Sequence, residues 1–125
     1  MSRPQLFNCL IRTHHITSRK KVQRVRRAAS QLNVDWLLIR SGSSPGLMFA
    51  EGPDETRLAD WVAAVQALRY KDFQCVRKPA PAVASSCKRP DGFHEVDSTA
   101  AFAKEMEAKG LSSWWRKAMG YEAGE

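Results

Sequence analysis

The chain has 125 residues, 43% of them hydrophobic and 26% charged, and this length and balance are typical of one globular domain with its own core, here residues 1–125. No stretch approaches the roughly 18 apolar residues of a membrane span, so we expect no membrane association. The three cysteines (Cys9, Cys75 and Cys87) lack a CxxC spacing, which argues against a disulfide framework or a zinc knuckle and favours an intracellular, reducing compartment.

The net charge of +7 is unevenly distributed along the chain. Residues 1–50 have a net charge of +8, with Asp35 as their only acid and nine cations: Arg3, Arg12, Arg19, Lys20, Lys21, Arg24, Arg26, Arg27 and Arg40. This asymmetry predicts an anionic partner, with nucleic acid the first candidate. The alternatives are a solvated helix face and, because the segment is arginine-rich and amphipathic, a mitochondrial transit peptide. We favour the nucleus or cytoplasm, with the mitochondrion as the third alternative, because this segment supplies a strand and a helix that the fold needs.

Six elements are predicted in the first 78 residues. In chain order they are a strand, a helix capped by Thr17 or Ser18, two strands, a second helix and a fourth strand, at 5–12, 19–32, 34–40, 47–50, 53–69 and 72–77. Pro45-Gly46 predicts a turn before the third strand, and Pro53 suits the first turn of the helix that follows it.

This order predicts the α+β class, with a ferredoxin-like βαββαβ core at residues 1–78. Right-handed crossovers then put both helices on one face of an antiparallel sheet. The strands at 5–12 and 34–40 are apolar at successive positions, so we expect cover on both faces of the sheet. The C-terminal region is the candidate for the second face.

Residues 79–92 are rich in Pro, Ala and Ser and predict a long connecting loop. Residues 93–125 are predicted as a C-terminal helical extension, with extended backbone at 93–97 and helices at 98–109 and 111–119. Trp114 and Trp115 are adjacent and cannot both face one helix interface, so we expect one in the core and the other at a rim or a contact surface.

Short motifs along the chain resemble a known family. They are His14-His15-Ile16, Lys20-Lys21, Pro45-Gly46-Leu47, Glu51-Gly52-Pro53 and Leu68-Arg69-Tyr70-Lys71. Together they are similar to the C-terminal domain shared by the second group of RWD-domain-containing proteins and by the spliceosomal pre-mRNA-processing factor three. The tail resembles the RWD-linked group at Phe93-His94-Glu95-Val96, Lys109-Gly110, Trp115 and Met119-Gly120.

The similarity begins at the first strand, without a preceding RWD domain, and covers nearly the whole chain. It implies a ferredoxin-like fold and, through the spliceosomal branch, RNA binding. We carry the RNA role over as a hypothesis.

The basic helix is the main candidate site. At 100° per residue, Lys20, Arg24 and Arg27 lie opposite the apolar positions, where they can follow a phosphate backbone. The predicted nucleic-acid contacts are Arg19, Lys20, Lys21, Arg24, Arg27 and, in the preceding turn, His15, with Arg26 as a further candidate. Trp114 and Trp115 are predicted to stack on bases or to contact a protein partner. No aromatic platform of the RRM type is predicted, because residues 46–51 offer only Phe49.

No motif predicts catalysis, a metal site or a cofactor. Acylphosphatases share the predicted topology, but Thr13-His14-His15-Ile16 stands where they have a glycine-rich anion loop. Paired carboxylates, a Walker loop and a Gly-x-Ser-x-Gly motif do not occur. We therefore expect a non-catalytic RNA-binding module. The alternative is a protein-protein interaction module that uses the Trp-bearing extension without binding nucleic acid.

Overall fold

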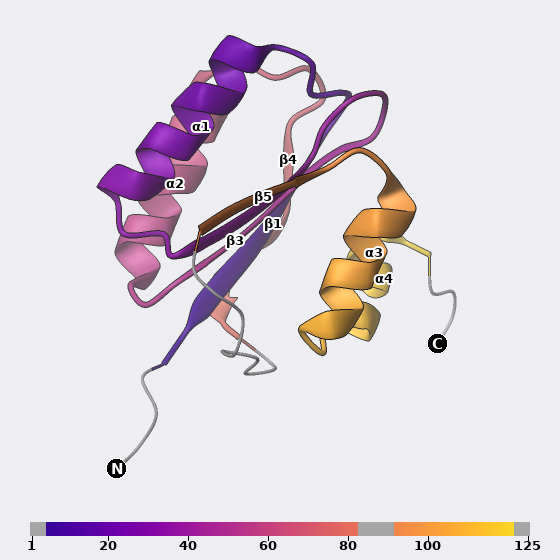
Figure 1. Ribbon diagram of the computed structural model, residues 1–125. Coiled ribbons are helices and arrows are strands. Elements are labelled where there is room, and N and C mark those ends of the chain that lie inside the picture. Colours follow the sequence, from indigo (N-terminus) through magenta and orange to yellow (C-terminus); the bar gives the residue numbers. More distant parts are fainter. Residues whose placement is uncertain (1–4, 83–91, 122–125) are drawn as a thin grey trace.

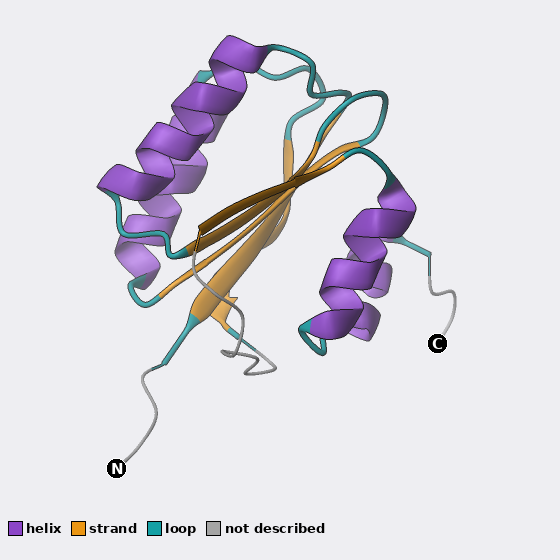
Figure 2. Cartoon of the chain, in the orientation of Figure 1, coloured by secondary structure: helices purple, strands orange, loops and turns teal. Residues whose placement is uncertain are grey.

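The computed structural model describes residues 5–82 and 92–121, which form a five-stranded sheet and four helices (Figures 1 and 2). In chain order the elements are β1 (Phe7–Thr13), α1 (Arg19–Gln31), β2 (Trp36–Arg40), β3 (Gly46–Gly52), α2 (Glu55–Ala67), β4 (Gln74–Pro81), β5 (Gly92–Val96), α3 (Thr99–Ala108) and α4 (Ser112–Met119). The predicted α+β class is therefore confirmed.

The strands lie in the order β4-β1-β3-β2-β5. The pairs β1–β3, β1–β4 and β2–β3 are antiparallel, whereas β5 runs parallel to β2, with Trp36 opposite Gly92 and Arg40 opposite Val96. The four strands of the predicted core are thus antiparallel, as expected, and the sheet has a fifth, parallel strand that was not predicted. Residues 93–96 have the extended backbone that the sequence indicates, and the strand ends before Asp97. The pairing of this segment with the free edge of β2 is a long-range contact that no local pattern encodes.

Helices α1 and α2 cover one face of the sheet (Figure 1). The Ser18 hydroxyl caps α1 by accepting from the Lys21 N–H at 3.2 Å, and the helix buries Val22, Val25 and Ala29. Trp61 of α2 is fully buried and donates its indole N–H to the Val25 carbonyl at 3.2 Å, so the two helices are joined across the core. One side of α1 is thereby fixed toward the protein, and its other side is left for solvent.

Helices α3 and α4 cover the opposite face (Figure 1). Phe102 and Trp115 pack in one cluster with Leu10, Leu38 and Phe49 of the strands, all at most 3% exposed. This arrangement explains why the strands are apolar at successive positions. It also closes the sheet face on which an aromatic platform would have to lie.

Most boundaries differ from the predicted ones by one or more residues, and two of the differences have a clear physical reason. β4 continues to Pro81, so residues 79–81 are strand rather than loop; prolines are tolerated there because β4 is an edge strand. Most of the remaining predicted loop, including Cys87, lies outside the described residues. Helix α2 begins after Pro53, because the Asp54 carboxylate caps it by accepting from the Arg57 N–H at 3.1 Å.

Candidate nucleic-acid interface

Three cations form a row along the solvent side of α1. Lys20, Arg24 and Arg27 are spaced one helical turn apart and all three are exposed, opposite the side that packs on the sheet. We call these three residues the basic ridge. The helix contains no acidic residue, so no carboxylate on α1 itself neutralises the ridge.

The ridge cations also have no partner elsewhere in the described part of the chain. No ion pair or hydrogen bond joins the Lys20, Arg24 or Arg27 side chain to another residue of 5–82 or 92–121. No acid of the described residues neutralises their positive charge, which faces solvent. A surface of this kind attracts anions.

Arg19, which the sequence places in the same predicted site, is instead held by an acid. Its two terminal nitrogens donate to the Glu95 carboxylate at 2.7 and 2.9 Å, and the Ser41 hydroxyl donates to the same group. The hydrogen bonds from Arg19 and then Ser41 lower the pKa of Glu95 to about 2. This bidentate pair attaches the start of α1 to β5, so the charge of Arg19 is largely neutralised within the protein.

Two more cations of α1 lie over aromatic rings. The Lys21 ammonium is 5.0 Å from the centroid of Tyr70, whose burial raises the pKa of its phenol to about 12. The guanidinium of Arg26 is 4.1 Å from the centroid of Phe93 on β5. The predicted site thus divides into a free ridge and flanking cations that are positioned by protein groups.

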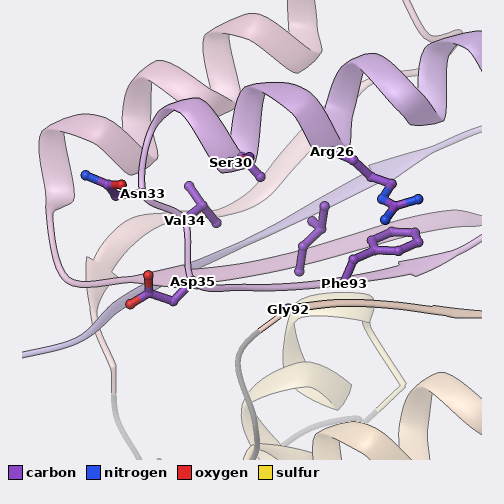
Figure 3. Close-up of a pocket in the computed structure, with 9 residues that line it drawn as sticks. Arg26, Ser30, Asn33, Val34, Asp35, Gly92 and Phe93 are labelled. Atoms are coloured by element: carbon purple, nitrogen blue, oxygen red, sulfur yellow. The ribbon is translucent and has the colours of Figure 1, made fainter.

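A groove of about 390 Å³ lies beside the ridge, between the C-terminal half of α1 and the start of β5 (Figure 3). Arg26 and Phe93 lie at one end of it, with Ser30, Asn33 and Asp35 toward the other (Figure 3). The sequence analysis missed this groove. It depends on Phe93 lying beside α1, and the spacing of the residues carries no signal for that contact.

The two histidines lie in the turn that leads into α1. His15 is exposed, and its ring stands edge-on to that of His14 at 5.1 Å between centroids. His14 Nδ1 is 3.5 Å from the Asp72 carboxylate, beside a polar hollow of about 320 Å³ that Arg12 also lines. His15 is therefore accessible at the N-terminal end of α1, whereas His14 lies against the Asp72 carboxylate.

Trp115 is the core residue that we expect of one of the two adjacent tryptophans, and its burial corrects its prediction as a stacking or partner-contact residue. Its side chain is 3% exposed and packs on Phe102 at 5.9 Å between ring centroids. Trp114 is half-buried, with Phe49 at 5.9 Å and the Arg77 guanidinium 5.5 Å from its ring. Both rings seal the second face of the sheet.

Within the described ranges no group of three or more His, Cys, Asp or Glu side chains is close enough to hold a metal ion. In those same residues, no helix combines the length and the apolar character that crossing a membrane requires.

Comparisons with known proteins extend the description of the fold. No family model and no curated protein sequence matches the chain. Among solved structures, the chain is similar to acylphosphatase from Bacillus subtilis, at 21% identity and a TM-score of 0.50, over 73% of this chain and 98% of that one. It is also similar to a chain described as BlrP1 BLUF, at 15% identity and a TM-score of 0.59, over 87% of this chain and 79% of that one. At these identities the likeness concerns the fold, which is α+β and similar to the ferredoxin-like fold of acylphosphatase.

Proposed function

We propose that this chain is a non-catalytic RNA-binding module of the type found in the spliceosomal pre-mRNA-processing factor three, and that α1 is its RNA-contacting helix. The observation that carries the proposal is the basic ridge, a row of three exposed cations on a helix without acidic residues. The side chains of these three cations have no ion pair or hydrogen bond with the described residues. Evenly spaced cations of this kind suit the repeating charge of a phosphate backbone.

The predicted contacts differ in the role that each has in this proposal. Lys20, Arg24 and Arg27 bind phosphates directly, and His15 extends the surface at the N-terminal end of α1. Lys21 adds positive potential, although its ammonium lies over the Tyr70 ring, whereas Arg19 is paired with Glu95 and contributes little. The motifs that resemble the spliceosomal domain favour RNA as the polyanion.

The alternative function, a protein-interaction module that uses the Trp-bearing extension, receives less support. Trp115 is buried and Trp114 is half-buried against Phe49, so their rings offer little apolar surface to a partner. Among the large hydrophobic side chains of the described ranges, Tyr121 is exposed, at 48%. A single exposed ring is a small contact area for a stable protein complex.

The test is fluorescence anisotropy with labelled single-stranded RNA, duplex RNA and single-stranded DNA at several salt concentrations. The ridge variant, Lys20→Gln, Arg24→Gln and Arg27→Gln together, removes three positive charges while keeping good helix formers. Loss of three phosphate contacts should flatten the slope of log K against log salt by roughly two for single strands. The matched control replaces Arg57, Lys104 and Lys117, three exposed cations on the other helices, by Gln.

We expect RNA binding that the ridge variant weakens strongly and that the control variant leaves nearly unchanged. Equal loss in both variants would mean that net charge, not the ridge, attracts the RNA. No saturable binding at low salt would refute the proposed function.

A further inference from the structure

We propose that the groove beside the basic ridge, between α1 and β5, is a pocket for one unpaired nucleobase of the strand whose phosphates the ridge binds. This inference rests on the proposed function and adds a base-contacting site to it. It follows from the composition of the groove, from the orientation of Arg26, and from the position of a second hollow next to the groove.

The groove has an apolar floor and a polar rim. Ala29, Val34 and Leu37 form the floor and are at most 8% exposed, whereas Ser30 and Asn33 at the rim are exposed. Its volume of about 390 Å³ lies within the range of small-ligand pockets. A nucleobase has the matching distribution, with two apolar faces and a polar edge that the Ser30 hydroxyl and the Asn33 amide can bind.

A flat cationic surface stands at one end of the groove. The Arg26 guanidinium lies over the Phe93 ring at 4.1 Å from its centroid, and Phe93 is itself half-buried against the core of the α1–α2 face (Figure 3). Phe93 thus positions the guanidinium, which is exposed and borders the groove. Arginine planes stack on bases in RNA recognition, and Arg26 can do so here. The Arg19–Glu95 pair joins α1 to β5 next to this stack, so the two elements that supply Arg26 and Phe93 are held together.

A second hollow, of about 310 Å³, shares Arg26 with the groove and Arg27 with the ridge. Gln23, Arg26 and Arg27 line it, so Arg26 borders both spaces and Arg27 belongs to the ridge. A phosphate held between Arg26 and Arg27 leaves the base of the same nucleotide beside the groove. The ridge and the second hollow therefore suit the phosphate of a nucleotide, and the neighbouring groove suits its base.

The experiment compares a short single-stranded RNA with an abasic strand that has the same sugar-phosphate backbone. Arg26→Lys keeps the positive charge but removes the flat guanidinium. Ser30→Leu fills the groove without a change of charge and lies on the exposed side of α1, where it should not affect folding. The control, Arg57→Lys, makes the same substitution on α2. Circular dichroism verifies the fold of each variant.

We expect the wild-type chain to bind the base-containing strand about tenfold more tightly than the abasic strand, which is the size of the effect of one stacked base. Arg26→Lys and Ser30→Leu should both remove most of that preference. Ser30→Leu, which lies outside the proposed phosphate position, should leave the affinity for the abasic strand unchanged. The ridge variant should weaken the binding of both strands by the same factor. If both groove variants keep the full preference, the base pocket is refuted while the proposed function stands.

If the wild-type chain binds neither strand, the proposed function fails, and the groove is judged by a separate titration. Adenosine and uridine monophosphates are added to ¹⁵N-labelled protein, and the amide signals of Ser30, Gly92 and Phe93 are followed. Saturable shifts at these amides that Ser30→Leu abolishes would retain the groove as a nucleotide pocket. Their absence would refute it.

Discussion

The buried ion pair between Lys109 and Glu51 fixes the end of α3 to the sheet and gives the sharpest test of the fold. The Lys109 ammonium lies 3.0 Å from the Glu51 carboxylate, with side chains 3% and 8% exposed. It also lies 4.4 Å from the centroid of the Trp36 ring. Each charge has been removed from water and depends on its neighbours for compensation.

Lys109→Met keeps an unbranched apolar stem and leaves the Glu51 carboxylate buried without its ammonium. Breaking a buried pair from one side costs about 3–5 kcal/mol, a large share of the 5–15 kcal/mol by which domains of this size are stable. The double variant Glu51→Leu, Lys109→Met removes both charges and fills the site with apolar atoms. We expect it to be more stable than the Lys109→Met single variant, because exchange of a whole buried pair is often neutral.

Urea unfolding followed by tryptophan fluorescence and by far-ultraviolet circular dichroism measures these free energies. Lys104→Met, on the exposed side of the same helix, is the control and should change stability by less than about 0.5 kcal/mol. A Lys109→Met variant as stable as this control would refute the buried pair. The Glu51→Leu single variant completes the cycle. A double variant that loses the sum of the Lys109→Met and Glu51→Leu losses would show that the two charges do not interact.

Two further predictions concern the C-terminal helices and β5. Trp115→Ala should cost about 3–5 kcal/mol of unfolding free energy in the urea assay and Trp114→Ala clearly less, because the first ring is buried and the second half-buried; equal losses would contradict the packing of α4. The pKa of Glu95 is lowered from 4.5 to about 2, so its stabilising contribution should be complete above pH 4.5 and disappear as the pH falls toward 2. The difference in urea midpoint between wild type and Glu95→Gln should shrink over that window, and a difference independent of pH would contradict the Arg19–Glu95 pair.

Local patterns predicted the elements of this chain well. The apolar positions of residues 19–32 fixed both the helix and its buried side, because a 3.6-residue period leaves one packing face for Val22, Val25 and Ala29. The apolar runs in β1 and β2 likewise indicated a sheet covered on both faces, and α3 and α4 provide that cover.

Contacts between distant residues decided what the sequence could not predict. Arg19 and Glu95 are 76 positions apart, and only the parallel pairing of β5 with β2 brings them together. The same pairing puts Phe93 under Arg26 and so creates the groove. A helical wheel of α1 gives no reason to treat its six cations differently. In the structure, Arg19, Lys21 and Arg26 contact protein groups, whereas the three ridge cations do not.

Cover on both sheet faces determines how this domain can bind a nucleic acid. Domains that read single strands on an open sheet use the same surface for affinity and for base contacts. Here α3 and α4 occupy that face, whereas the basic ridge lies on the outer side of α1 and the groove lies beside it at the β5 edge. Under the proposed function, the ridge binds phosphates and the groove binds a base, and Arg26 borders both sites. Salt should therefore weaken the affinity for base-containing and abasic strands by the same factor, and leave the ratio between them unchanged.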